Sequence, residues 1–138
     1  MAKFNLETRS ELVSAKKSIK YIHSMGEDTS FGTNDFDHVS MSLVSHELPA
    51  HAAKAIFKEA YRILPSGGVF SFMDIDPESL FFQKFASNPI AFTAFKSTEP
   101  WIQEYVSMDL VTTLKDCGYK SIQIRANSPR HRTVVAFK

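Results

Sequence analysis

The sequence predicts an α/β fold in which two parallel strands are joined by a helix and the chain closes with an antiparallel hairpin. One observation is a strand, a helix and a second strand in succession over residues 36–73, the length of a right-handed crossover unit. The other is a pair of strand-like runs around a turn signal at the end of the chain. With 138 residues, 43% of them hydrophobic, the chain is long enough for a single core, so we expect one domain.

The first half of the chain contains the predicted crossover. Residues 6–17 have the spacing of a short amphipathic helix, and residues 18–23 alternate apolar and polar side chains as a strand does. A glycine-containing loop over 24–35 precedes a second strand over 36–44. Residues 51–64 predict a helix with Lys54, Lys58, Glu59 and Arg62 toward water, and Gly67 and Gly68 lead into a third strand over 69–73.

The second half predicts two more helices and the closing hairpin. Asp76 and Pro77 are suited to begin a helix over 78–86, since Asp caps the first amides and Pro fits the first turn. An apolar stripe predicts one continuous helix over 101–117 that ends at Gly118. Strands over 120–124 and 133–137 follow, joined by residues 127–130.

Charge and composition narrow the classes of partner and compartment. The formal net charge is +1, which gives no reason to expect a nucleic acid or an anionic membrane as partner. No apolar run approaches the roughly 20 residues of a membrane-spanning helix. Cys117 is the only cysteine, so no intramolecular disulfide can form. We therefore expect a soluble protein of a reducing compartment, either the cytoplasm or an organelle interior.

Four segments stand in the order and approximate spacing of a known family. They read MGEDTSF at 25–31, DFDHV at 35–39, LVSHELP at 43–49 and EAYRILPSGG at 59–68. In these segments the chain resembles the class I S-adenosylmethionine-dependent methyltransferases, most closely those of ubiquinone and menaquinone biosynthesis. The resemblance implies a partial Rossmann-like methyltransferase fold and methyl transfer from S-adenosylmethionine to a small-molecule acceptor.

The resemblance also implies a role for each matching residue. Glu27 and Asp28 correspond to the acidic loop that accepts a hydrogen bond from the adenine amino group, a task suited to an acceptor-only carboxylate. Ser42 lies on the strand that passes under the sulfonium end of the cofactor, and His46 and Glu47 would be catalytic residues on the acceptor side. The implied cofactor-binding set is Gly26, Glu27, Asp28, Thr29, Phe31 and Ser42.

One family feature has no counterpart in residues 1–17, which contain no glycine. Class I methyltransferases begin their sheet with a strand that runs into a glycine-rich loop, whose bare backbone approaches the methionine part of the cofactor. We therefore expect residues 1–138 to form one methyltransferase-like domain that lacks the glycine-rich strand-loop. The second predicted strand would then have an open edge, which favours a homodimer.

Simpler interpretations stand beside these roles. Glu27 and Asp28 could belong to a solvated loop, and His46 with Glu47 could begin a helix, because a histidine is not a base without a partner in reach. His23, His38 and His51 do not have metal-ligand spacing, so we expect no metal site.

The phenylalanines of residues 81–95 and the function of the whole chain also allow alternatives. These side chains could form core or line an apolar acceptor pocket. One rival function is a non-catalytic subunit that pairs through the open sheet edge. Another is an unrelated α/β enzyme that uses Asp74 and Asp76 as acid and base. Absence of S-adenosylmethionine binding would favour either rival.

Overall fold

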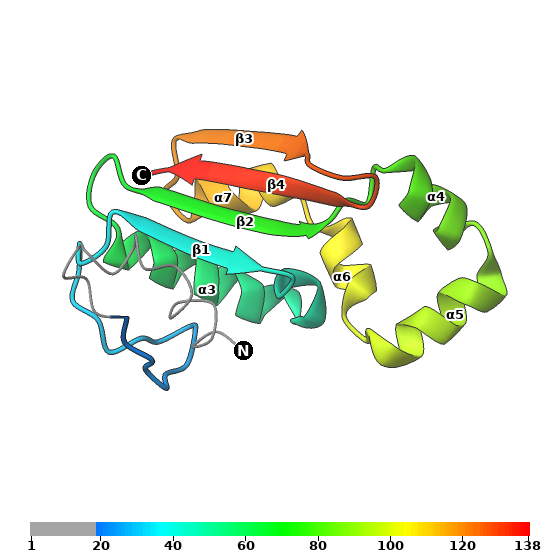
Figure 1. Ribbon diagram of the computed structural model, residues 1–138, viewed down its shortest axis with the longest axis horizontal. Helices are drawn as coiled ribbons and strands as arrows, with labels where there is room; N and C mark the ends of the chain where they lie inside the picture. Colours follow the sequence, from blue (N-terminus) through cyan, green and yellow to red (C-terminus); the bar gives the residue numbers. More distant parts are fainter. Residues whose placement is uncertain (1–18) are drawn as a thin grey trace, which may run out of the picture.

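The computed structural model describes residues 19–138, whose strands form one four-stranded sheet (Figure 1). The strands are β1 (His38–Ser42), β2 (Val69–Ile75), β3 (Ser121–Ala126) and β4 (His131–Phe137), and their order across the sheet is β1-β2-β4-β3. β1 and β2 are parallel, whereas β4 is antiparallel to both of its neighbours. The predicted α/β class and the closing hairpin are confirmed. The helix predicted over residues 6–17 lies outside the described residues.

Helix α3 (Ala50–Ile63) connects β1 to β2 and completes the predicted crossover. Its buried face carries Ala53, Phe57 and Ala60, which recur at helical spacing. The chain leaves the helix through Pro65 and turns into β2 at Gly67, whose φ of 83° lies in the region that glycine adopts without strain. This turn allows β2 to lie beside β1 in the sheet.

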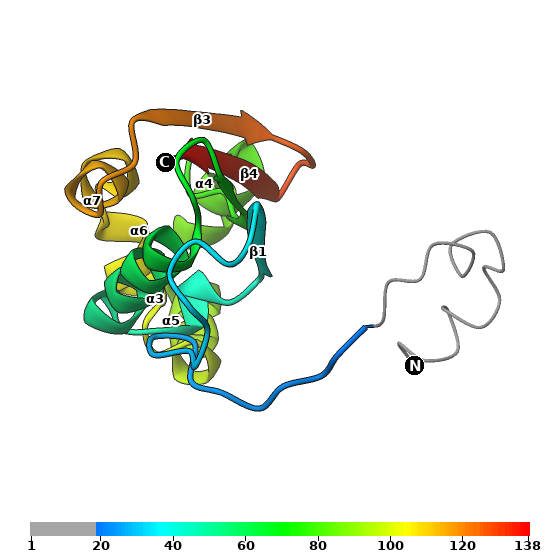
Figure 2. The ribbon, with the colours of Figure 1, turned by 90° about the vertical axis from the view of Figure 1, so that its left-hand side faces the viewer.

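The helices α3 and α7 (Leu110–Asp116) cover the same side of the sheet (Figure 2). The alternation of β2 places Phe70 and Phe72 on that side, where Phe57 lies against Phe72 with ring centroids 5.4 Å apart. Burying each of these rings contributes roughly 1.5–3 kcal/mol. The same alternation places Asp74 on the buried side of the sheet, where a carboxylate needs partners.

Two short helices, α4 (Leu80–Ala86) and α5 (Pro89–Thr98), extend beyond the end of the sheet (Figure 1). The cap of α4 is the Ser79 side chain, which accepts a hydrogen bond from the Phe82 amide, and so the helix begins after the predicted Asp76 cap. Helix α5 was missed in the sequence, although Asn88 caps it and Pro89 occupies its first turn.

The single helix predicted over residues 101–117 is wrong, because the structure has α6 (Ile102–Ser107) and α7 (Leu110–Asp116) there. The backbone is extended at Met108, and Asp109 caps α7 by accepting from the Thr112 amide at 3.0 Å. The break lets Tyr105 pack with Phe82 and Ile102, while Leu114 joins the main core under the sheet. One straight helix could not serve both clusters.

The strand predicted over residues 18–23 is also wrong for the part that the structure describes, residues 19–23. Alternating side chains give strand propensity, but a strand also needs a neighbour for its backbone hydrogen bonds. Ile19, Tyr21 and Ile22 are each more than half exposed, and the nearest pairing is an isolated bridge between Met25 and Asp28. Among the described residues the outer edge of β1 stays without a strand partner.

No helix within residues 19–138 is long and apolar enough to cross a membrane.

Candidate active site

A buried pair of side chains lies where β1 and β2 both end. Asp74, on β2, has no solvent exposure, and its Oδ1 lies 2.5 Å from Nδ1 of His46. The same carboxylate accepts from the Ser45 amide at 2.9 Å and from the Ile75 amide at 2.7 Å. Three donors therefore compensate the buried charge.

The chain reaches this geometry through an unusual backbone turn after β1. Leu43 has a φ of 55°, a left-handed conformation that is rare for leucine, and its amide donates to the Met73 carbonyl at 2.8 Å. The turn leads into η1 (Ser45–Glu47), a single 3-10 turn that places His46 over the end of β2. Backbone outliers of this kind are concentrated at functional sites, where surrounding contacts hold them.

The environment of His46 fixes both its tautomer and its charge preference. The Asp74 carboxylate accepts from two backbone amides and from the ring, so Nδ1 of His46 carries a proton and Nε2 is the ring nitrogen available to a substrate. The hydrogen bond to Asp74 raises the pKa of His46, and burial opposes this effect. The charges of Asp74, Glu99 and Glu47 raise that pKa further. A histidine held in this way is a stronger base than a free one.

Tyr105 and Arg132 enclose the pair from α6 and β4. The Tyr105 hydroxyl donates to the Ile75 carbonyl at 2.7 Å, and its ring lies edge-on to His46 with centroids 6.3 Å apart. Arg132 on β4 is the residue directly opposite Asp74 in the β2–β4 register. Its Nη2 donates a hydrogen bond to the Tyr105 oxygen at 3.5 Å. Burial raises the pKa of Tyr105 to about 12, so this hydroxyl stays protonated. Tyr105 therefore acts at this site as a neutral hydrogen-bond donor and as a packing partner of the His46 ring.

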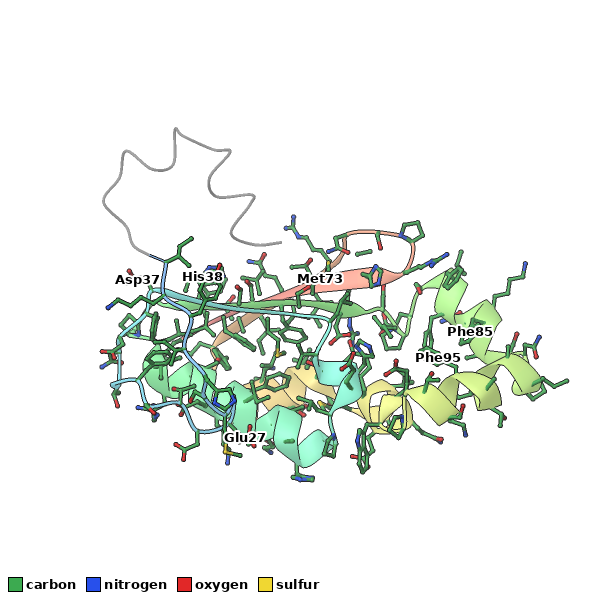
Figure 3. The ribbon with its side chains drawn as sticks, turned by 60° about the horizontal axis from the view of Figure 1, so that its bottom comes forward. Glu27, Asp37, His38, Met73, Phe85 and Phe95 are labelled. Atoms are coloured by element: carbon green, nitrogen blue, oxygen red, sulfur yellow. The ribbon has the colours of Figure 1, made fainter. Side chains whose placement is uncertain are left out.

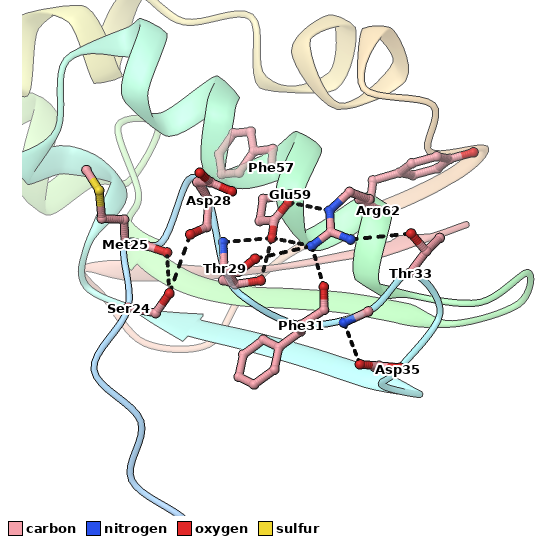
Figure 4. Close-up of polar contacts among 12 residues, drawn as sticks. Ser24, Met25, Asp28, Thr29, Phe31, Thr33, Asp35, Phe57, Glu59 and Arg62 are labelled. Carbon is pink, nitrogen blue, oxygen red and sulfur yellow. Dashed lines mark hydrogen bonds and ion pairs between the residues drawn. The ribbon is translucent and has the colours of Figure 1, made fainter.

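The acidic loop of residues 25–31 is attached to α3 through two charged side chains (Figure 4). The Thr29 amide donates to Glu59 Oε1 at 2.9 Å, and the Thr29 hydroxyl donates to the same oxygen. Arg62 pairs with Glu59 at 2.7 Å and donates to the Phe31 carbonyl at 2.8 Å. Glu59 is only 7% exposed, so the prediction that it faces water is wrong. Its partner Thr29 lies in a different loop, which helical periodicity alone does not reveal.

The residues named from the sequence as cofactor ligands lie in two separate places. Glu27 and Asp28 are exposed in the loop beside α3, and Gly26 lies against Ile56 of that helix. Ser42 is exposed at the end of β1, on the face that alternates with the partly buried Val39 and Met41. The remaining two, Thr29 and Phe31, are the loop residues that Glu59 and Arg62 hold.

The proposed catalytic residues, by contrast, lie together. Potential ligand atoms of His46, Glu47 and Glu99 all lie within 4.8 Å of one another. The sequence interpretation missed Glu99, Tyr105 and Arg132, and it considered Asp74 only in a rival function. Asp74 could have been found, because the spacing of Phe70, Phe72 and Asp74 assigns it to the buried face of a strand.

An apolar cavity lies beside the end of β2, where α4 and α5 extend from the sheet. Its volume is about 330 Å³. Phe85 and Phe95 pack edge to face there, with ring centroids 5.3 Å apart (Figure 3). The cavity is lined by Ile75, Phe81, Phe82, Phe85, Phe95, Arg130 and His131. Phe82 belongs to a buried cluster, as core packing predicts, and it also lines the cavity with Phe81, Phe85 and Phe95. That an acceptor binds in this cavity stays a prediction.

Comparison with curated proteins finds a relative that is described as a methyltransferase. A curated relative, an uncharacterized methyltransferase from Synechocystis sp., is 28% identical over 105 residues, which cover 75% of this chain and 47% of that protein. The chain thus spans about half the length of this relative.

Two solved structures with a similar fold are described as methyltransferases. One, from Thermotoga maritima, is described as an S-adenosylmethionine-dependent methyltransferase and possible histamine N-methyltransferase. Its TM-score is 0.62 at 16% identity, with 94% of this chain and 69% of that chain covered. Another is phosphoethanolamine N-methyltransferase 2 of Haemonchus contortus in complex with S-adenosylmethionine, with a TM-score of 0.53, 13% identity, and 82% and 35% covered. At these identities the likeness establishes the fold alone.

The family follows from a match that includes the acidic loop, β1, α3 and most of β2. Residues 2–72 match the family described as methyltransferase domain. The chain therefore belongs to the methyltransferase domain family, among the class I S-adenosylmethionine-dependent methyltransferases.

Proposed function

We propose that this chain takes part in methyl transfer from S-adenosylmethionine to a small-molecule acceptor, with residues 1–138 acting as a single domain. The observation that carries the proposal is the His46–Asp74 pair at the ends of two parallel strands. Ligands of open α/β sheets bind at the carboxyl ends of the strands, and this end holds the one imidazole that is oriented by a buried carboxylate within residues 19–138.

In the proposed reaction His46 is the base and Asp74 positions it. The nucleophilic atom of the acceptor attacks the methyl carbon, and the bond from that carbon to the sulfonium sulfur breaks. S-adenosylhomocysteine leaves with the electron pair, and the proton of the acceptor passes to Nε2 of His46. Asp74 stabilises the imidazolium that forms. Positioning of the two reactants would supply much of the rate enhancement.

We assign the cofactor to the acidic loop and the end of β1. Glu27 and Asp28 are exposed carboxylates that make no ion pair within the described residues, so an adenine amino group could reach them. The anchoring of Thr29 and Phe31 by Glu59 and Arg62 limits the motion of that loop, which favours binding because less entropy is lost. Gly26 and Ser42 complete the assigned set.

We propose an acceptor of the kind methylated in ubiquinone and menaquinone biosynthesis, an aromatic ring with an apolar substituent. The apolar cavity beside β2 supports this choice, since four phenylalanines line about 330 Å³ there. The cavity lies near the catalytic pair, because its lining residue Ile75 directly follows Asp74 in β2. The Ile75 carbonyl also accepts a hydrogen bond from the hydroxyl of Tyr105, which packs against His46.

A transfer assay with methyl-labelled S-adenosylmethionine and a reduced quinone tests the assignment. The unsubstituted chain should label the acceptor, and His46→Gln should lower the rate by about 10²–10⁴-fold. His51→Gln is the matched control, because His51 is exposed on α3. Equal loss in both variants, or no loss in His46→Gln, would remove His46 from the mechanism.

A second candidate is a non-catalytic subunit that forms a homodimer through β1. The observation that favours it is the outer edge of β1, which has no strand partner within residues 19–138, since exposed edges tend to pair with another chain. Sedimentation of the chain with and without Ser40→Pro tests it, because proline removes an edge hydrogen-bond donor in the centre of β1. A dimer that dissociates in the variant supports pairing through the edge, and a monomer in both contradicts it.

A further inference from the structure

Three side chains with metal-ligating atoms converge beside the end of β2. His46 and Glu47 belong to η1, whereas Glu99 is the C-terminal cap of α5, more than 50 positions later in the chain. Their ligand atoms lie within 4.8 Å of one another. Glu104 of α6 accepts from the Ala50 amide at 2.8 Å and so connects α6 to the start of α3, directly after η1. The cluster therefore combines side chains from η1 and from the C-terminal end of α5.

His46 is already oriented as a metal ligand. Its side chain is 91% buried, and its Nδ1 donates a hydrogen bond to the Asp74 carboxylate. Among the described residues, none is hydrogen-bonded to its Nε2. Histidines that bind metals commonly donate their second ring proton to a carboxylate, which fixes the ring and makes the free nitrogen more basic. Asp74 fills that role here.

We propose that Nε2 of His46 and the carboxylates of Glu47 and Glu99 bind a divalent transition-metal ion such as Zn²⁺. One imidazole and two carboxylates form a mixed nitrogen and oxygen donor set of the kind that suits Zn²⁺ and its neighbours. Ligand bonds of about 2.0–2.2 Å require the three atoms to approach more closely than 4.8 Å. Glu47 is exposed and Glu99 is partly exposed, so their side chains have room to rotate inward.

Charge supports a cation at this place. Within residues 19–138, Glu47 and Glu99 form no ion pair, and Asp74 lies directly behind the histidine. A divalent ion would compensate this concentration of carboxylates. No metal-ligand spacing is visible along the sequence, because Glu99 is far from His46 in the chain.

Metal binding and methyl transfer at His46 would exclude one another. A bound cation occupies the lone pair of Nε2, so His46 cannot accept a proton at the same time. The ion would therefore inhibit methyl transfer that uses His46 as base, and its removal would restore it.

Calorimetric titration of the untagged full chain with Zn²⁺ tests the site. One ion should bind per chain, and Glu99→Gln or Glu47→Gln should lower the affinity roughly tenfold or more, because each removes a charged ligand. Asp74→Asn should lower it about 10–100-fold without removing a ligand. Glu78→Gln and His51→Asn are controls with exposed side chains outside the cluster, and circular dichroism checks that each variant folds.

Two results would overturn the inference. One is the absence of stoichiometric binding at millimolar Zn²⁺. The other is binding that is equally strong in folded Glu47→Gln, Glu99→Gln and control variants, which would place the ion elsewhere. Neither result bears on S-adenosylmethionine binding or on methyl transfer by the metal-free chain, which the labelled transfer assay measures separately.

Discussion

His46 and Asp74 are 28 positions apart in the sequence, and their side chains are joined at 2.5 Å between Nδ1 and Oδ1. The crossover is what brings them together, since one residue follows the first parallel strand and the other lies near the end of the second. A histidine that looks isolated in the sequence thereby gains the partner that a base requires.

Asp74→Asn should lower the rate of methyl transfer by about 10²–10⁴-fold while leaving S-adenosylmethionine affinity unchanged. The amide can donate to Nδ1 and so favours the wrong histidine tautomer, whereas the proposed cofactor residues lie in other loops. Steady-state rates and cofactor calorimetry on the same preparation measure the two effects. A parallel loss of cofactor binding would show a structural role for Asp74 in place of the catalytic one.

The pairing of Glu59 should make stability depend on acid. Hydrogen bonds from Arg62 and Thr29 lower the pKa of Glu59 to about 2 from its ordinary 4.5. Because the folded pKa is depressed, this stabilisation is fully present above about pH 4.5 and is lost as the pH falls toward 2. Allowing for solvent around Arg62, it amounts to about 1–2 kcal/mol.

Urea unfolding of the unsubstituted chain and Glu59→Gln across this range measures that dependence. The difference in unfolding free energy between the two should be largest at neutral pH and should shrink in acid. A difference that stays constant between pH 6 and pH 3 would contradict the assigned pairing.

Gly118→Ala should destabilise the fold by about 1–3 kcal/mol. Gly118 has a φ of 109°, and an added Cβ would lie 2.7 Å from the Tyr61 ring. Gly67→Ala is the matched control, because Gly67 also has a positive φ of 83° but has nothing within 4 Å of the added carbon. Thermal unfolding should give the larger loss for Gly118→Ala, and equal losses would show that backbone conformation alone sets the cost.

Double replacement of Glu27 and Asp28 by their amides should weaken S-adenosylmethionine binding about tenfold or more, since hydrogen bonds to charged groups contribute about 1.5–3 kcal/mol. The carboxylates are exposed, so folding should be unaffected. Glu78→Gln is a control of the same chemistry at another exposed position. Unchanged affinity in the double variant would assign the adenine to another part of the chain.

The crossover and the hairpin could be predicted because their signals are local. Helical spacing in residues 51–64, the glycines that follow and the alternation of each strand are all visible within a short window of sequence. The strand over residues 18–23 was predicted in error because alternation does not reveal whether a neighbouring strand exists. The break at Met108 escaped because Tyr105 and Leu114 are at helical spacing yet pack into different clusters.

The candidate site could be predicted only in part for the same reason. The resemblance predicted roles for His46 and the acidic loop, but the side chains that contact them come from distant segments. Asp74 reaches His46 across the crossover, and Glu59 reaches Thr29 from a helix 30 positions later. Periodicity within a short segment of sequence does not predict contacts between residues so far apart.

The central claim is that this chain binds S-adenosylmethionine. Calorimetric titration of the chain with S-adenosylmethionine tests this claim most directly. The account predicts saturable heat with one molecule bound per chain, reduced in the Glu27 and Asp28 double variant. No heat at millimolar cofactor, with the chain shown to be folded, would contradict it.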